Sequence, residues 1–361
     1  KQYVLDGLTG AVTQSTTMSA SLVLDNDAHS IYVVNDGLNG DEPAMKDVNG
    51  DYTLLRNINQ IGTSSSASEF VSFGGSNYFT ADDGTNGREI WKVTGSGTPA
   101  IFSTGISDEN CCGSMVDSLV VSGSKLFFSA VSSSFRKELY VSDGTVGGTV
   151  MVKDINTDNG WCWWCSPYPD NLTAFNGKVV FRAGLNNDRE MWVSDGTSAG
   201  TFRLADINTN GSSEPDQIAV LGDRLYFRAR NTQGRHQLWS TDGTVAGTGL
   251  VKDFNPNGNI EFSVNESRGT GSVAAIKVYD GGQYSWQWYV SSGTPSTTRF
   301  LDPYPTDSQW PEWVTVSGPN IFFSAFDLSN DRELYRVNQA GQTARIANFN
   351  ESASAEPSIL T

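Results

Sequence analysis

Short stretches of alternating hydrophobic and polar residues, separated by turn residues, run along the whole chain. The clearest unit is 166–207, in which SPYPDNLTAF, KVVFRA, REMWVS and TFRLADI are four candidate strands. Asn176-Gly177 joins the first two and is a strong hairpin signal. Apolar positions at helical spacing do not extend over a full helix anywhere. Short strands with a turn about every ten residues are typical of an all-β fold.

One string recurs three times, as KELYVSDGTVGGT at 137–149, REMWVSDGTSAGT at 189–201 and HQLWSTDGTVAGT at 236–248. In its Asp-Gly-Thr centre, we expect the Asp side chain to accept hydrogen bonds from backbone N–H groups and the Gly to adopt a left-handed conformation. We interpret these strings as structural turns between the third and fourth strands. The alternative is that they are ligand sites.

An aromatic residue marks the same repeated strand in seven units. The anchors are Tyr32, Trp91, Tyr140, Trp192, Trp239, Tyr289 and Tyr335. Their spacing of roughly 50 residues matches the period of propeller blades. We therefore predict one β-propeller domain over residues 1–361, with seven four-stranded blades and a ring closed by pairing of the N- and C-terminal strands. Eight blades is the alternative, because YVLDGLTGAV near the N-terminus resembles a further strand–turn–strand piece.

The repeats carry a resemblance to a known family. REIW, KELYVSDGTVGGT, REMWVSDGTSAGT and HQLWSTDGTVAGT, followed by VKDIN, LADIN and VKDFN, resemble the ELWxxDGTxxGT repeats of secreted bacterial proteins. The similarity is close over about 130–255 and weaker at both ends. It implies an extracellular β-propeller and no particular biochemical activity.

The net charge of the chain limits the classes of partner that it can bind. A formal charge of −16 argues against nucleic acid, which requires a basic surface. No run approaches the ~20 apolar residues that a membrane span needs. We therefore expect no nucleic-acid partner and no membrane insertion, and the family resemblance implies a secreted or cell-surface protein.

Candidate metal ligands lie in the crossovers from the fourth strand of one blade to the first strand of the next. These crossovers and the loops between second and third strands share one face, here called the crossover face; the repeated DGT turns lie on the opposite turn face. Two crossovers read DxNxNGxxE, a pattern of oxygen ligands around a glycine turn that suits calcium. The predicted ligands are Asp206, Asn208, Asn210 and Glu214; Asp253, Asn255, Asn257 and Glu261; and Asp154, Asn156 and Asp158 in a partial copy. The alternative is that these residues only form turns.

The four cysteines also fall in two crossovers, Cys111 and Cys112 in one, Cys162 and Cys165 in the next. Clustered cysteines in an acidic, helix-poor chain indicate extracellular disulfides. Two bridges between the crossovers would link adjacent blades. A vicinal bond with a separate local bond, a four-cysteine zinc site and a redox pair remain alternatives.

Aromatic residues in the crossovers are candidate partner contacts, because large rigid faces stack well at binding surfaces. They are Trp161, Trp163, Trp164, Tyr168 and Trp310. The alternative is that they pack over the seam between blades.

Catalytic patterns are missing from the sequence. Only His29 and His236 are present, and no triad, metalloprotease or phosphate-loop motif is found. The sequence therefore predicts an extracellular binding or adhesion module, stabilised by calcium, that recognises a glycan or a cell-surface protein through the crossover face. One alternative is a structural subunit or decoration of an extracellular filament or surface layer, with self-assembly. Another is a carbohydrate-active enzyme similar to propeller polysaccharide lyases.

Overall fold

The computed structural model describes residues 3–5, 12–14, 19–25, 30–35, 39–46, 51–61, 64–102, 106, 114–131, 136–155, 166–184, 188–279, 286–301, 311–327 and 331–347. The chain divides into two compact units. The first comprises residues 1–186 and 194–201, and the second comprises 187–193 and 202–361. No described helix is long and apolar enough to cross a membrane.

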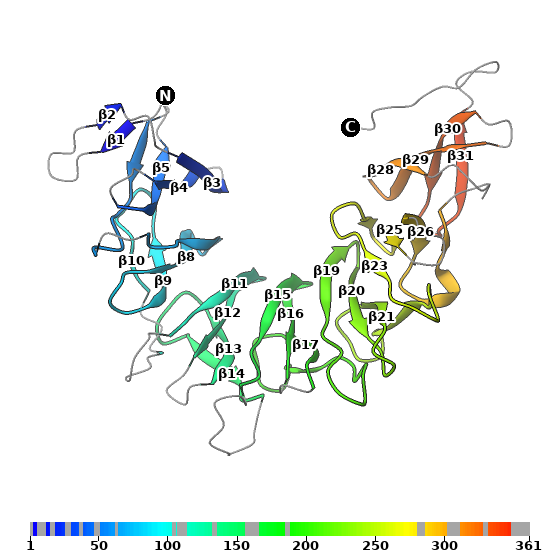
Figure 1. Cartoon of the computed structure of the whole chain (residues 1–361), viewed down its shortest axis with the longest axis horizontal. Helices are drawn as coiled ribbons and strands as arrows, with labels where there is room; N and C mark the ends of the chain where they lie inside the picture. Colours follow the sequence, from blue (N-terminus) through cyan, green and yellow to red (C-terminus); the bar gives the residue numbers. More distant parts are fainter. Residues whose placement is uncertain are drawn as a thin grey trace. The chain divides into compact units, whose positions relative to one another are not determined.

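Antiparallel sheets follow one another in chain order (Figure 1). A two-stranded hairpin comes first, made of β1 (Tyr3–Leu5) and β2 (Val12–Gln14). Among the described residues, six four-stranded sheets and one five-stranded sheet follow it. The first three sheets are β3 (Ser19–Asp25), β4 (Ser30–Asn35), β5 (Asp41–Lys46) and β6 (Tyr52–Leu54); β7 (Ser68–Phe73), β8 (Ser76–Asp82), β9 (Arg88–Val93) and β10 (Ala100–Ile101); and β11 (Asp117–Ser122), β12 (Lys125–Val131), β13 (Lys137–Ser142) and β14 (Val150–Lys153).

The remaining four sheets repeat this order. They are β15 (Asp170–Phe175), β16 (Lys178–Ala183), β17 (Glu190–Ser194) and β18 (Phe202–Arg203); β19 (Asp216–Leu221), β20 (Arg224–Arg230), β21 (His236–Thr241) and β22 (Gly249–Lys252); β23 (Glu261–Phe262), β24 (Arg268–Thr270), β25 (Val273–Tyr279), β26 (Trp286–Ser291) and β27 (Arg299–Phe300); and β28 (Glu312–Ser317), β29 (Asn320–Phe326), β30 (Arg332–Val337) and β31 (Thr343–Ala347). The single 3-10 turn in the described part of the chain, η1 (Pro295–Thr297), precedes β27.

This order confirms the predicted all-β architecture of repeated four-stranded sheets, which is how propeller blades are built. Within the first unit, β3, β7, β11 and β15 contact one another in succession, and within the second unit β24 contacts both β19 and β28. Within each unit, successive sheets therefore meet through their first strands, with β24 in this place in the five-stranded sheet.

One anchor was misplaced. Tyr32 lies on β4, the second strand of its sheet, whereas the other six anchors lie on third strands. The third strand there is β5, in which Glu42 corresponds to Glu89 of REIW and Ala44 takes the aromatic position. Counting aromatic residues fails in this sheet because a small residue replaces the aromatic one.

Hydrophobic cores lie between successive sheets. One cluster combines Tyr78 and Ile90 with Leu126 and Phe128, side chains of the second and third sheets. In the second unit, another combines Tyr226 and Leu238 with residues of the next sheet. The second strand β12 is buried on both faces, since its five central residues are all buried. Within each unit, these clusters stabilise successive sheets by packing them against one another.

The repeated DGT strings form turns on the turn face, as we interpreted them. Asp195 Oδ1 accepts hydrogen bonds from Thr197 N at 2.8 Å and from Thr197 Oγ1 at 2.7 Å. Gly196 has φ +87°. A Cβ on Gly200 would lie 2.2 Å from the Asp195 carboxylate, so glycine is required there. Asp143 and Asp242 accept the same two bonds in their own turns.

Candidate functional site

Many predicted site residues lie outside the described part of the chain. They are Cys111, Cys112, Cys162, Cys165, Trp161, Trp163, Trp164, Trp310, Asn156 and Asp158. Disulfide pairing, the aromatic contacts of these tryptophans and the partial calcium loop therefore stay predictions. Asp154, the first residue of that partial loop, is exposed directly after β14.

The crossover at 206–214 forms a turn held together by its own side chains. Asn208 Oδ1 accepts a bond from Asn210 N at 3.3 Å, and Asn208 Nδ2 donates to Ser212 O at 2.9 Å. Glu214 Oε1 accepts a bond from Ser212 Oγ at 3.0 Å. Side chains predicted as metal ligands are thus engaged within the loop.

The second full copy, at 253–261, is similar. Asn255 Oδ1 accepts a bond from Asn257 N at 3.3 Å, and Asn255 Nδ2 donates to Asn259 O at 3.2 Å. Glu261 Oε2 pairs with Arg228 Nη1 at 2.6 Å. Gln237 Nε2 donates to Asp253 Oδ1 at 3.4 Å.

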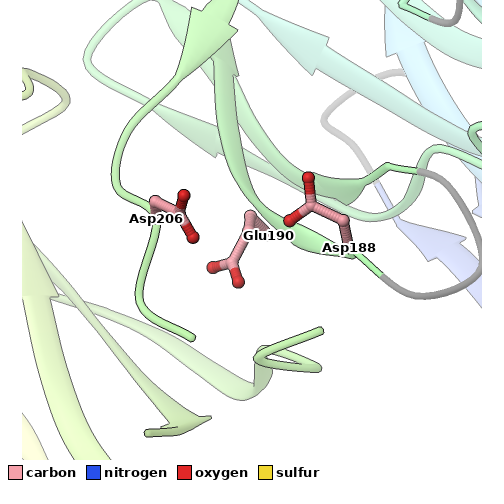
Figure 2. A group of neighbouring side chains, drawn as sticks. All are labelled: Asp188, Glu190 and Asp206. Atoms are coloured by element: carbon pink, nitrogen blue, oxygen red, sulfur yellow. The ribbon is translucent and has the colours of Figure 1, made fainter. Parts of the chain in front are cut away.

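One acidic cluster involves the predicted ligand Asp206. Carboxylate oxygens of Asp188, Glu190 and Asp206 all lie within 4.8 Å of one another. Figure 2 shows Glu190 between the two aspartates. Asp188 precedes β17, Glu190 begins that strand, and Asp206 follows β18, so the fold of one sheet edge assembles the cluster.

An arginine already supplies positive charge to this cluster. Arg203 Nη1 lies 3.1 Å from both Asp188 carboxylate oxygens, and its Nη2 lies 3.1 Å from Asp206 Oδ2. The Glu190 carboxylate accepts bonds from loop groups, described below. Calcium needs about six to eight oxygen ligands that are free to coordinate. The residues therefore fit a cation poorly as they stand, and the geometry favours the interpretation of these loops as turns.

A buried glutamate anchors this crossover, and it was not recognised from the sequence. Glu190 is fully buried. Its Oε2 accepts bonds from Ile207 N at 3.3 Å and Ser213 Oγ at 2.5 Å, and its Oε1 from Asn208 N at 3.4 Å and Ser213 N at 3.1 Å. Desolvation raises the pKa of Glu190, and these hydrogen bonds oppose that rise. The carboxylate binds the loop rather than a ligand.

The same link recurs in other sheets. Glu42 accepts bonds from Ile58 N at 3.0 Å and Asn59 N at 3.3 Å. Glu89 accepts bonds from Ser114 N at 2.8 Å and Ser114 Oγ at 2.6 Å. The signal for this link was present in the repeated RExW and KExY strings, whose second residue is acidic in most copies.

Glu138 departs from this pattern. It is 2% exposed, Ile155 N donates to its Oε2 at 3.4 Å, and its Oε1 has no hydrogen-bond partner among the described residues. Desolvation, reinforced by the charge of Asp154, raises the pKa of Glu138 to about 8. This carboxylate is therefore the least satisfied of the described linking glutamates.

First strands begin with an unusual backbone on the crossover face. Non-glycine residues with positive φ occur in pairs three residues apart, here called left-handed pairs, of which the first precedes the strand and the second is its second residue. The described pairs are Ser66 and Glu69, Met115 and Ser118, Tyr168 and Asn171, and Glu214 and Gln217. Trp313 holds the second position in β28. Such conformations each cost of order 1–3 kcal/mol, persist only where the surrounding structure enforces them, and cluster at functional sites.

Some of these residues present large side chains to solvent. Met115 is 50% exposed, Tyr168 44% and Trp313 53%. Others link sheets, since Glu69 accepts a bond from Ser118 N at 2.9 Å, and Gln217 Oε1 accepts one from Phe262 N at 3.0 Å. The exposure of Tyr168 fits its predicted contact role, which stays untested.

Ion pairs stand at the same end of the sheets. The first residue of the first strand is acidic and pairs with a cation from the second or third strand. These pairs are Asp117 with Lys137, Asp170 with Arg182, Asp216 with Arg228, and Glu312 with Arg332. The sheet β7–β10 differs, because Ser68 takes the acidic position beside Arg88.

The described histidine occupies a framework position. His236 begins β21, and its Nε2 accepts a bond from Arg230 Nε at 3.1 Å. Desolvation and the nearby charges of Arg228 and Arg230 lower the pKa of His236. His29 lies outside the described residues. No catalytic role is assigned to either.

Neither a protein-family model nor a curated protein matches the sequence. Among solved structures, the chain is similar to a prolyl endopeptidase at 10% identity and a TM-score of 0.48, covering 91% of this chain and 49% of that one. It is similar to the β-propeller domain of the Trilobed protease from Pyrococcus furiosus at 10% identity and a TM-score of 0.42, covering 94% and 98%. It is also similar to a puromycin-hydrolyzing peptidase of Mycobacterium tuberculosis at 10% identity and a TM-score of 0.43, covering 91% and 53%.

The chain thus spans about half the length of the first and third of these proteins. Similarity at this level carries no inference about activity or substrate.

Proposed function

We propose that this protein is an extracellular binding module, a seven-bladed β-propeller that recognises a glycan or a cell-surface protein through its crossover face. The observation that carries the proposal is the left-handed pair. The same strained backbone is built at the start of successive first strands, while the side chains mounted on it differ from sheet to sheet.

This arrangement suits recognition for a physical reason. The surrounding sheet imposes the conformation, so an exposed residue such as Tyr168 loses little further entropy when a partner binds. Aromatic side chains contribute large contact areas on rigid supports. A constant scaffold with variable exposed residues is the usual design of a binding surface.

A glycan array and capture of surface proteins with the purified chain test the proposal. Tyr168→Ala and Trp313→Ala should weaken binding at least tenfold without lowering the melting temperature. Val146→Ala is the matched control, because Val146 is 52% exposed on the turn face of β13 and β14. Equal loss of binding in the control would count against recognition by the crossover face.

Ring closure belongs to the same proposal. The resemblance to DGT-repeat propellers and the succession of blade-like sheets support a ring in which the terminal segments pair. Removal of residues 351–361 should then lower the free energy of unfolding, since the N-terminal segment would lose the strand with which we propose it pairs and would leave a free edge. Unchanged urea denaturation of the truncated chain would argue against closure through that segment.

A second candidate function has its own support. Outer strands carry exposed apolar side chains, including Val150, Met151, Phe300 and Ile346. Such edges suit lattice contacts in a filament or surface layer. Light scattering over a concentration series distinguishes the two, because a lattice subunit should assemble and Met151→Lys should keep it monomeric.

A further inference from the structure

A pocket of about 420 Å³ opens on the crossover face of the first unit. Its polar lining comes from Asp82 at the end of β8, Arg88 at the start of β9, Asp117 of β11 and Lys137 of β13, and Met115 adds an apolar side chain. The pocket therefore lies at the seam between two successive sheets.

Arg88 is the exceptional residue in this pocket. Its guanidinium donates to Ser66 O at 3.0 Å, to Thr80 Oγ1 at 2.6 Å and to Ser68 Oγ. All three acceptors are neutral. Nε–H and one N–H of Nη1 have no partner among the described residues.

Comparison with the other sheets shows that Arg88 lacks an acidic partner. In four other sheets the residue equivalent to Ser68 is Asp or Glu, and it pairs with the local cation. Lys137, in the same pocket, is neutralised by Asp117 in this way. Asp82 stands opposite Arg88 in the β8–β9 ladder, yet it forms no ion pair with it. Arg88 is thus a cation in a pocket without the carboxylate that its counterparts have.

The neighbouring groups indicate what else a ligand would offer. Asp82 Oδ1 accepts a bond from Gly84 N at 2.7 Å, and Asp82 Oδ2 has no partner among the described residues. Two backbone donors beside the pocket are engaged, since Val116 N donates to Arg88 O at 3.3 Å and Lys137 N donates to Ser166 Oγ at 2.7 Å. The pocket therefore offers one cation, a carboxylate acceptor and the apolar surface of Met115.

We infer that this pocket binds a uronic acid residue, with the sugar carboxylate on Arg88, a sugar hydroxyl donating to Asp82 and a C–H face of the ring against Met115. Arginine–carboxylate bonds are among the stronger polar contacts in proteins. The overall charge of −16 disfavours long polyanions, so a single acidic sugar in an otherwise neutral glycan fits best. A peptide carboxyl terminus fits less well, because the backbone amides of Val116 and Lys137, two donors that could hold one, already have acceptors. This inference rests on the proposed binding role of the crossover face.

Calorimetric titration of the full chain with D-glucuronate tests the inference, with D-glucose and N-acetylglycine as comparison probes. Glucuronate should bind at least tenfold more tightly than either. Ser68→Asp supplies the acidic residue found in the other sheets, so it should reduce glucuronate binding at least tenfold while keeping or raising the melting temperature. Ser96→Asp adds the same charge in the exposed turn between β9 and β10 and should leave binding unchanged.

Three outcomes would overturn the inference: equal binding of glucose, equal binding of N-acetylglycine, or full glucuronate binding by Ser68→Asp. The outcomes also separate this inference from the broader proposal. Binding of neutral glycans that depends on Tyr168 but not on Ser68 would preserve the proposed function and reject the uronic acid pocket. Glucuronate binding that is lost in Ser68→Asp but unchanged in Tyr168→Ala and Trp313→Ala would support the pocket and would show that the left-handed pairs do not carry recognition.

Discussion

The carboxylate of Glu190 accepts a hydrogen bond from the backbone amide of Ile207 at 3.3 Å, 17 residues further along the chain. This bond ties the third strand of one sheet to the crossover that leads to the next. Glu42 holds Ile58, and Glu138 holds Ile155, in the same way. In these three strings the acidic residue is therefore a connector between the third strand of a sheet and the crossover that follows it.

Replacement of this connector should destabilise the protein. Glu190→Gln places an amide NH₂ against donors that now share two carboxylate oxygens, so at least one buried donor loses its acceptor. We expect a loss of about 1–3 kcal/mol in the free energy of unfolding at neutral pH. Urea denaturation measures it, and a variant as stable as the parent would show that the crossover does not depend on this carboxylate.

Glu138→Gln, in contrast to Glu190→Gln, should stabilise the protein at high pH. The folded-state pKa of Glu138 is raised to about 8 from an ordinary value of 4.5. Its contribution is therefore fully present at low pH and is lost as the pH rises through about 8, because the folded protein must then hold a buried, poorly paired charge. Glutamine already occupies the equivalent position at Gln237 and Gln287.

The free energy of unfolding of Glu138→Gln, relative to that of the parent, should consequently increase from acidic pH to above about 8, by up to a few kcal/mol, and the melting temperature should rise with it. Calorimetry over a pH series measures the difference. Parallel curves for the two proteins would contradict the argument, and Glu190→Gln provides the matched control at the same structural position.

Neighbouring glycines in one DGT turn should differ sharply. A Cβ on Gly148 would lie 2.1 Å from Asp143 Oδ1, whereas a Cβ on Gly147 would meet nothing within 4 Å. Gly148→Ala should therefore cost about 1–3 kcal/mol, the usual range for overpacking. Gly147→Ala should stay within about 0.5 kcal/mol of the parent. Similar losses in both variants, measured by thermal denaturation, would refute this description of the turn.

Calcium is testable through Arg203. Because this guanidinium neutralises Asp188 and Asp206, we expect excess EDTA to leave the melting temperature of the parent protein unchanged. Arg203→Met should lower stability by about 1 kcal/mol, and millimolar calcium should restore part of it by replacing the lost positive charge. A clear drop in the parent's melting temperature with EDTA would instead support the calcium loops predicted from the sequence.

Local chemistry made part of the fold predictable. The Asn176-Gly177 turn between β15 and β16 and the Asp195 turn are encoded by residues that act on their immediate neighbours, and both residues of the first have positive φ. Tyr32 misled the alignment of the first sheet because Ala44 stands where other sheets carry an aromatic residue.

The candidate site was harder to predict from the sequence, for a physical reason. Left-handed backbone at Met115, Tyr168 or Trp313 is imposed by the surrounding sheet and not by the residue, so no glycine or asparagine marked most of these positions. The missing acidic partner of Arg88 depends on strand register, because Ser68 occupies the position at which other sheets carry an acidic residue. Sequence distance likewise concealed the link between Glu190 and the loop that it holds.

The connecting glutamate also bears on how such a chain could have grown. Most copies of the repeat carry both halves of this joint, the acidic residue of the third strand and the crossover amide that follows it by about one strand–turn–strand segment. A tandem duplication of one unit would thus also duplicate the hydrogen bond that joins its third strand to the crossover, and no new contact surface would have to evolve. Gain or loss of whole blades should be tolerated more readily than cuts placed between Glu190 and Ile207.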